Sequence, residues 1–176
     1  NGRFTQSTYA LDAAGGPGGD DPNWIGESRE FEGRLTAKPA KFRTWEPVGA
    51  LTYSHHQRRT DNEPDQAHPE RLHGIYDSSR VQAQWQNNFY LADSNTLVAG
   101  VEFESEFGLA SETGTWGENT LGEQAARTAG VFFQNQQGWG ALRLTVGSRM
   151  DWHERYGWVA TYRLAPSYDL LRLADR

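Results

Sequence analysis

The clearest feature of the chain is a strict alternation of apolar and polar residues in its central part. In residues 79–91 apolar side chains occupy every second position, interrupted only at Asn87, with polar side chains between them. The alternation resumes after a turn-like sequence at 92–95, over residues 97–109, and it appears again over 142–152. A period of two places successive side chains on opposite faces of a β-strand, so the first two segments predict an antiparallel hairpin.

The length of these segments narrows the class of β protein. Each keeps its alternation for about 11 to 13 residues, whereas strands usually have about 5 to 6 and a tilted membrane-spanning strand needs about 9 to 11. Weaker alternation predicts five further strands, at residues 3–11, 27–37, 47–57, 128–135 and 158–170. The chain is thus expected to contain about eight strands and no extended helix.

The connections between these strands alternate between long and short. Long ones are predicted at 12–24, 59–77 and 110–127, the last with a short helical turn near 119–127, and short ones at 38–46, 92–95 and 136–141. Outer-membrane barrels have long loops on one side and short turns on the other, although the short connection at 154–157 departs from this rule. The predicted fold class is therefore all-β: an antiparallel up-and-down transmembrane β-barrel segment of about eight long strands.

In such a barrel one parity of each strand faces the lumen and the other faces lipid. The polar parity is predicted to face the lumen and comprises Arg80, Gln82, Gln84, Glu102, Glu104, Glu106, Arg143, Arg149 and Asp151. The apolar parity is predicted to face lipid and comprises Val81, Trp85, Phe89, Val101, Phe103, Leu142, Leu144, Val146, Met150 and Trp152. In the central hairpin, parity and the tight turn predict Gln84 opposite Glu102 and Gln82 opposite Glu104.

The composition of the chain argues against several classes of function. The chain has 176 residues, enough for one domain, and no cysteine, which excludes disulfide scaffolds, thiol nucleophiles and cysteine-based zinc sites. Its net charge of −6 and the lack of a basic run argue against nucleic acid as a partner. The mean hydropathy of −0.78 is too low for a helical membrane protein, but it suits a membrane barrel, in which every second residue is polar. The first residues show no targeting signal, as expected of a cytoplasmic chain or of a piece of a longer protein.

Three carboxylates invite a catalytic interpretation. Glu102, Glu104 and Glu106 share one strand face at successive separations of about 6–7 Å, and paired carboxylates serve acid/base chemistry on glycosides. The alternative is a solvated lumen wall with polar residues of the neighbouring strand opposite. We favour the wall, because no carboxylate has a context that would desolvate it, as an acid catalyst requires. Since the chain also has no credible serine–histidine pair, we expect it not to be an enzyme.

Two groups of residues could bind a metal ion. The first gathers at one strand end and its loop: His55, His56, Asp61, Asp65, His68 and His73. Adjacent histidines in a strand point to opposite faces, so a solvated loop is the favoured interpretation. The second group, beside the glycine-rich stretch 15–19, offers weak calcium candidates without EF-hand spacing: Asp12, Asp20 and Asp21. The expectation is therefore no metal and no cofactor.

Ring-bearing side chains fall into two sets. The first set lies in the predicted long loops and consists of candidates for stacking against a ligand, with ordinary loop packing as the alternative: Trp24, His68, Tyr76 and Trp116. The second set lies near strand ends or on apolar faces, where it suits interfacial aromatic girdles: Trp45, Trp85, Trp152 and Tyr162.

Short motifs point to a family. The sequence GSRMDWHERYG at 147–157, followed by TYRLAPSY at 161–168, resembles the barrel of TonB-dependent outer-membrane receptors. In that family a strand with a Gly-x-Arg-x-Asp pattern leads through a glycine-containing turn to a strand resembling Thr-x-Arg-x-x-x-x-Tyr. TAGVFFQ at 128–134 resembles the preceding strand, and DDPN at 20–23 resembles a loop motif of the same barrels. The resemblance covers most of the chain.

The resemblance implies ligand-gated import of a scarce nutrient, such as an iron–siderophore or a cobalamin, across the outer membrane of a Gram-negative bacterium. The partners it implies are outer-membrane lipid, the small-molecule nutrient and an inner-membrane energy-coupling complex that pulls on an N-terminal plug. The chain lacks the plug and the energy-coupling box, has about eight strands where these receptors have 22, and ends without the closing aromatic strand. We therefore expect residues 1–169 to be a partial barrel domain and 170–176 a truncated or out-of-pattern tail, in a fragment that does not transport alone.

The alternative from another class is a soluble all-β module that binds a ligand or carbohydrate through its loop tryptophans. Alternation fits both classes, because a sandwich also buries one parity of each strand. Strand length and the asymmetry of the connections favour the membrane barrel.

Overall fold

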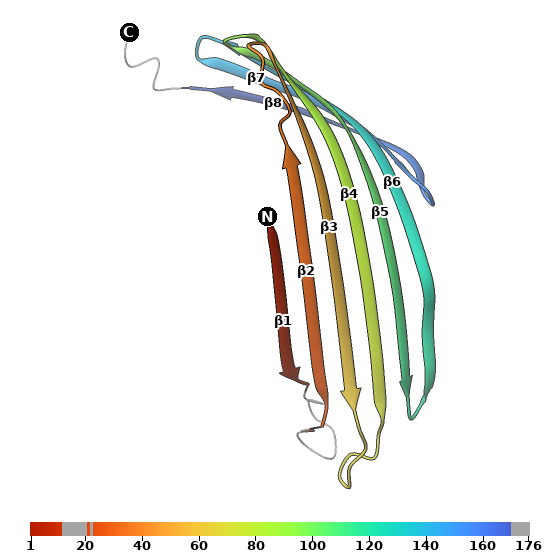
Figure 1. Cartoon of the computed structure of the whole chain (residues 1–176). Helices are drawn as coiled ribbons and strands as arrows, with labels where there is room; N and C mark the ends of the chain where they lie inside the picture. Colours follow the sequence, from red (N-terminus) through yellow and green to blue (C-terminus); the bar gives the residue numbers. More distant parts are fainter. Residues whose placement is uncertain (12–20, 22, 170–176) are drawn as a thin grey trace. The chain divides into compact units, whose positions relative to one another are not determined.

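The computed structural model describes residues 1–11, 21 and 23–169, which form one eight-stranded sheet (Figure 1). The strands are β1 (Gly2–Ala10), β2 (Ile25–Ala37), β3 (Trp45–Asn62), β4 (Leu72–Ala92), β5 (Asn95–Gly114), β6 (Gly117–Trp139), β7 (Leu142–His153) and β8 (Gly157–Tyr168). Within the part of the chain that the structure describes, no helix is long and apolar enough to cross a membrane.

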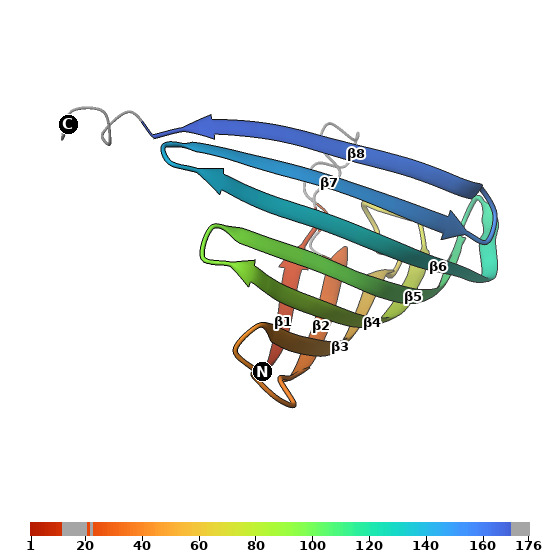
Figure 2. The same ribbon diagram turned by 90° about the horizontal axis from the view of Figure 1, so that it is seen from above.

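Each strand is hydrogen-bonded to its neighbours in the sequence, in the order β1 to β8. β1 and β2 pair antiparallel, from Gly2 opposite Gly33 to Ala10 opposite Ile25. β7 pairs antiparallel with β6 on one side and with β8 on the other, and these three strands lie side by side in Figure 2. The predicted all-β, antiparallel up-and-down fold is confirmed, and each of the eight predicted strands is present.

The chain divides into two compact units, which are described separately. The first unit comprises Asn1–Arg34, Thr52–Val81 and Ser105–Ala125, and the second comprises Leu35–Leu51, Gln82–Glu104 and Ala126–Arg176. β1 belongs to the first unit and β7 and β8 to the second, while β2 to β6 each contribute a segment to both.

Two predicted long loops are much shorter in the structure. β4 already begins at Leu72, so the loop predicted at 59–77 is reduced to residues 63–71. β5 and β6 continue to a two-residue turn, and the helical turn predicted near 119–127 is part of β6. Residues 117–125 are exposed on both faces and therefore show no alternation. The strands β5 and β6 nevertheless extend to the turn, and the pairing of β5 with β4 extends as far, since the Thr115 backbone N–H donates to the Arg71 carbonyl at 2.9 Å.

In the second unit, strand pairing separates polar and apolar side chains onto opposite faces of the sheet. Arg149 is paired with Phe132 and Thr161, whereas the next residue, Met150, is paired with Val131. Paired residues share a face and successive residues alternate between faces. Met150 is 45% and Val131 52% exposed, and no hydrophobic side chain among the described residues is buried. The apolar face is therefore left uncovered by the part of the chain that the structure describes.

The contacts within the β4–β5 hairpin agree with its predicted register. A Cβ added at Gly108 would lie 3.9 Å from the Cβ of Ser78, so these two positions face each other. Continued along both strands without a bulge, this register places Gln84 opposite Glu102. The polar positions of the two strands then share one face.

Candidate functional site

A guanidinium and two carboxylates form the Arg149 cluster on the polar face of the second unit. Arg149 Nε donates to both carboxylate oxygens of Asp151, at 2.9 and 2.8 Å, and Arg149 Nη2 donates to Glu102 Oε1 at 3.1 Å. The side chains of Glu102 and Asp151 are 17% and 20% exposed, and that of Arg149 is 36% exposed. Charge-assisted bonds of this kind are the strong class of side-chain hydrogen bonds. The Arg149 cluster therefore ties β5 to β7.

Gly130 makes this contact across three strands possible. β6 lies between β5 and β7, and Gly130 is the β6 residue paired with Asp151. A Cβ added at Gly130 would clash with the Asp151 carboxylate and would lie 3.0 Å from Arg149 Nη2. The missing side chain leaves the space through which the guanidinium reaches across β6 to Glu102.

The Arg149 cluster is poorly suited to acid/base catalysis. A catalytic carboxylate pair needs one carboxyl group that can donate a proton, whereas Glu102 and Asp151 both accept hydrogen bonds from one guanidinium. In the first unit, Glu106 lies 3.7 Å from Arg80 Nε in an exposed ion pair. The geometry of the carboxylates thus favours a polar wall over a catalytic pair.

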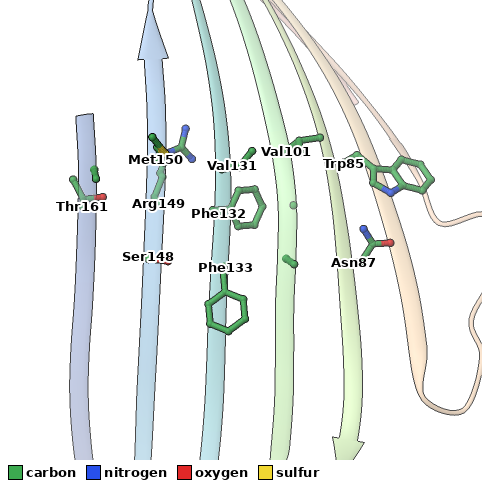
Figure 3. A pocket seen from close by; sticks show the side chains of 13 residues that line it. Trp85, Asn87, Val101, Val131, Phe132, Phe133, Ser148, Arg149, Met150 and Thr161 are labelled. Carbon is green, nitrogen blue, oxygen red and sulfur yellow. The ribbon is translucent and has the colours of Figure 1, made fainter. Parts of the chain in front are cut away.

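A shallow pocket in the second unit crosses strands β4 to β8 (Figure 3). Its lining includes Trp85, Val101, Val131 and Met150, and the last two are paired with each other on the apolar face. Phe132 and Arg149 are also among the lining residues, but their side chains lie on the polar face, where the Phe132 ring lies so close to Gly100 that a Cβ there would clash with it. Since Trp85, Val101, Val131 and Met150 belong to the apolar parity, this pocket is a hollow of the apolar face and offers apolar contact.

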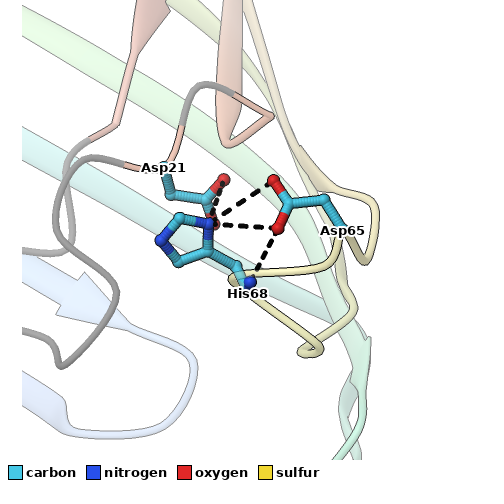
Figure 4. A group of neighbouring side chains, drawn as sticks. All are labelled: Asp21, Asp65 and His68. Carbon is cyan, nitrogen blue, oxygen red and sulfur yellow. Dashed lines mark hydrogen bonds and ion pairs between the residues drawn. The ribbon is translucent and has the colours of Figure 1, made fainter.

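The second candidate site, the Asp21 cluster, lies in the first unit and consists of Asp21, Asn62, Asp65 and His68. Figure 4 shows the two carboxylates and the imidazole close together, and each offers an atom within 4.8 Å of the others. His68 Nδ1 lies 3.3 Å from Asp65 Oδ1 and 3.9 Å from Asp21 Oδ1. Asn62, the last residue of β3, donates from Nδ2 to Asp21 Oδ2 at 2.8 Å. Asp21 and Asn62 are only 3% and 6% exposed, so this side of the cluster is sheltered from water.

The loop at 63–71 fixes the position and charge of Asp65. Asp65 Oδ1 accepts the backbone N–H groups of Ala67 and His68 at 2.8 and 2.7 Å, and Oδ2 accepts Asn23 Nδ2 at 3.0 Å. The backbone N–H of His68 has the largest effect in holding the pKa of Asp65 below its ordinary value. Asp65 is therefore an ionised, pre-oriented carboxylate at neutral pH.

The remaining histidines of the predicted metal group have other partners. His55 and His56 are neighbours in β3, and His55 lies 3.7 Å from Asp77, whereas His56 lies 3.1 Å from the Ser28 hydroxyl. His73 pairs with Asp61 in an exposed position. Two of the three calcium candidates, Asp12 and Asp20, lie outside the described residues. Among the candidates that the structure describes, the group brought together is Asp21, Asp65 and His68.

The four predicted ligand-stacking residues occupy different kinds of position. His68 belongs to the Asp21 cluster, and Trp24 borders it, where the Trp24 backbone N–H donates to the Asp21 carbonyl at 3.2 Å. The prediction that Tyr76 lies in a loop is wrong, because β4 starts earlier than its alternation indicates and includes this residue. The Tyr76 ring lies 5.9 Å from that of His56, centroid to centroid. Trp116 lies in the tight turn between β5 and β6 and is 88% exposed.

Aromatic residues mark both ends of the apolar face on β6 to β8. Trp152 pairs with Trp158 at one end of the β7–β8 hairpin. At the other end Leu142 pairs with Trp139 and with Tyr168. The other predicted girdle residues lie elsewhere in the second unit: Tyr162 pairs with Ser148 between these ends, Trp85 is within β4, and Trp45 Nε1 donates to Asn87 Oδ1 at 3.2 Å.

β7 carries members of both predicted parities, and they lie on opposite faces. One face carries Arg143, Arg149 and Asp151, and the other carries Leu142, Leu144, Val146, Met150 and Trp152. Whether these faces meet a lumen and lipid stays a prediction.

Two residues of the candidate sites, Gly130 and Asn62, were not predicted from the sequence. A glycine inside an alternating strand signals close approach of another group, so Gly130 had a detectable signal. Asn62 had none, because it follows a polar stretch in which neither parity is apolar.

Comparison with known proteins assigns no family to this arrangement. No model of a known protein family matches the chain, and no curated protein matches it significantly.

Proposed function

We propose that this chain is part of an outer-membrane, energy-coupled receptor that imports a scarce nutrient, such as an iron–siderophore or a cobalamin. The observation that carries the proposal is the apolar face of the second unit, which the described residues leave uncovered. In this proposal outer-membrane lipid covers that face, and the polar face with the Arg149 cluster lines the lumen. The nutrient and the energy-coupling complex are carried over from the resemblance to TonB-dependent receptors.

The height of the apolar face supports a lipid-facing band. On β7 it extends from Leu142, paired with Trp139, to Trp152, paired with Trp158. About ten steps of strand at about 3.4 Å each give about 34 Å, or about 24 Å for a strand tilted by about 45°. The apolar band of an outer-membrane barrel is about 25 Å tall and has aromatic residues at both edges. Both the height and the aromatic ends of this face match that band.

Strand length supports the same proposal. β4, β5 and β6 have 21, 20 and 23 residues, whereas a strand needs about 9 to 11 to cross the membrane. In the first unit, residues 117–125 of β6 are exposed on both faces and mostly polar. A strand that continues beyond the lipid into water requires this composition.

Two substitutions at neighbouring residues of β4 test the assignment of the faces. Trp85→Arg, in the full chain refolded in lipid vesicles, should lower the free energy of unfolding by about 2–4 kcal/mol near the bilayer midplane and by less toward an interface. Gln84→Arg, on the polar face, should be nearly neutral. The measurement is urea unfolding followed by tryptophan fluorescence. Equal effects of the two substitutions would refute the proposed lipid-facing side.

Behaviour in plain buffer separates this proposal from a soluble binding module. An uncovered apolar face of this extent should drive aggregation without detergent, because soluble monomers rarely expose contiguous apolar patches of more than a few hundred Å². Size-exclusion chromatography with and without detergent makes the comparison. A sharp monomer peak at 19.8 kDa in plain buffer, with cooperative thermal unfolding, would contradict the membrane proposal and favour the soluble module.

A further inference from the structure

We propose that the Asp21 cluster is a binding site for a divalent cation of the zinc type, with ligands from Asp21, Asp65, His68 and Asn62. All four residues belong to the first unit. The proposal does not depend on the function proposed above, because it would hold equally for a membrane receptor and for a soluble module.

The spacing of the cluster fits a tetrahedral ion. With metal–ligand distances of about 2.0–2.1 Å, neighbouring ligand atoms of a tetrahedral zinc site lie about 3.3–3.4 Å apart. His68 Nδ1 lies 3.3 Å from Asp65 Oδ1 and 3.9 Å from Asp21 Oδ1. A contraction of a few tenths of an ångström at Asp21 would complete this geometry. Figure 4 shows the side chains of these three residues directed toward a common space.

The hydrogen bond between the His68 imidazole and the Asp65 carboxylate is a long one. Direct N–H···O bonds measure about 2.7–3.2 Å, whereas His68 Nδ1 lies 3.5 Å from Asp65 Oδ2 as well as 3.3 Å from Oδ1. Shorter hydrogen bonds from other groups hold the carboxylates: Asn23 Nδ2 and two backbone N–H groups donate to Asp65, and Asn62 Nδ2 donates to Asp21. Donors that orient the ligands in this way are typical of metal sites.

Asn62 supplies an independent indication of a ligand. Its side-chain amide is turned to the cluster, since Nδ2 lies 2.8 Å from Asp21 Oδ2. The oxygen of the same amide, Oδ1, is buried and has no hydrogen-bond partner among the described residues. A buried carbonyl oxygen left in this state costs free energy that a bound cation would recover. Asn62 Oδ1 is therefore assigned as the fourth ligand.

The donor set selects the class of ion. Calcium and magnesium prefer sites made only of oxygen ligands, with six or more contacts. An imidazole nitrogen combined with carboxylate oxygens suits zinc and its neighbours among the transition metals. Asp21 and Asp65 together supply two negative charges to balance a divalent ion, and the shelter at Asp21 and Asn62 limits competition from water.

The test uses the full chain, refolded in detergent and stripped of metal with a chelator. Zn²⁺ is then titrated in competition with a chromophoric chelator of known affinity. We expect one equivalent to bind, and His68→Gln and Asp65→Asn each to weaken binding by more than about tenfold. Asn62→Ala should weaken it by about 10- to 100-fold. A roughly hundredfold excess of Ca²⁺ should not displace Zn²⁺.

The exposed His73–Asp61 pair provides the matched control, because it places the same residue types in the same unit. His73→Gln and Asp61→Asn should leave the affinity unchanged, and far-UV circular dichroism should show that all variants keep the β-structure. Absence of stoichiometric binding, binding that persists in His68→Gln, or equal loss in His73→Gln would overturn the proposal, as would displacement by Ca²⁺. For the unaltered chain, Co²⁺ gives a second measurement: an intense visible spectrum of tetrahedral cobalt is expected, and the weak spectrum of octahedral cobalt would also overturn the site.

Discussion

The Arg149 cluster of the second unit and the Asp21 cluster of the first unit contain similar groups in different arrangements. Each joins two carboxylates to one basic side chain. In the Arg149 cluster the guanidinium donates at 2.8 to 3.1 Å to both carboxylates. In the Asp21 cluster a single imidazole nitrogen lies 3.3 and 3.9 Å from its two carboxylates. The contacts of the first cluster are of ordinary hydrogen-bond length, whereas those of the second are longer and leave space between its members.

This difference separates a cluster that contains its own cation from one that can accept a cation from solution. Arginine stays protonated and has five N–H donors but no lone pair to offer, so it can pair with both carboxylates but cannot join them in binding a metal. Histidine is neutral over much of the physiological pH range and then has a lone pair for a metal. Two carboxylates around an arginine therefore make a structural joint, whereas the same two around a histidine make a candidate ligand site.

Arg149→Met is expected to have the largest effect on the free energy of unfolding. The substitution leaves Glu102 and Asp151, both mostly buried, without their shared cation, which should lower the free energy of unfolding by about 2–3 kcal/mol once partial exposure is allowed for. Arg143→Met, an exposed residue on the same face of β7, should change it by less than about 0.5 kcal/mol. Urea unfolding of the refolded chain measures both, and similar values would show that the cluster contributes no more than a surface arginine.

Gly130→Ala should have the next largest effect. Its methyl group would clash with the Asp151 carboxylate and press on Arg149 Nη2, at a cost of about 1–2 kcal/mol in free energy of unfolding. Gly122→Ala, in the same strand with no atom within 4 Å of the added carbon, is the matched control and should be close to neutral. A destabilisation of equal size at both glycines would point to a general effect of alanine in β6.

Asn62→Ala tests the Asp21 cluster, both without metal and with Zn²⁺ bound. Without metal it removes the donor to the buried Asp21 carboxylate, so the free energy of unfolding should fall by about 1 kcal/mol. Saturating Zn²⁺ should stabilise the unaltered chain and should stabilise this variant less. Thermal unfolding with chelator and with Zn²⁺ measures both changes in stability. An equal stabilisation by Zn²⁺ in the variant and in the unaltered chain would show that Asn62 is not a ligand.

The smallest effect is expected from Asp61→Asn. Asp61 and His73 are each 54% exposed, and exposed ion pairs contribute between zero and about 1 kcal/mol. The free energy of unfolding should change by less than about 0.5 kcal/mol, measured in the same urea titration. A loss comparable to that of Asn62→Ala would mean that burial does not distinguish the Asp21 cluster from a surface pair.

The strands could be predicted from the sequence wherever one face is apolar. β7 keeps its alternation over nearly its whole length, and its observed bounds, Leu142–His153, differ from the prediction by one residue. Residues 72–78 of β4 and the first part of β6 were not predicted as strand, because neither parity is consistently apolar there. In these segments the strands continue through backbone hydrogen bonds, and no alternation of apolar and polar residues indicates them in the sequence.

The two clusters could be predicted only in part. Parity placed Glu102, Arg149 and Asp151 on one face, because parity is a property of each strand alone. Their contact depends on the register of three strands and on the space at Gly130, which no single strand encodes. The Asp21 cluster was harder still, since Asn62 and Asp21 are 41 positions apart, and their approach follows from how a loop folds back.

Gly130 also bears on how the strands find their correct partners. A slip of β6 by two residues against β7 keeps every side chain on its own face, so the alternation gives no protection against this error. Such a slip would bring Phe132 or Thr128 opposite Asp151, and a side chain there would block the path of the guanidinium to Glu102. Only one register of β5, β6 and β7 allows both carboxylates to pair with Arg149. A misaligned sheet would lack that joint, separate more readily and have the opportunity to pair again.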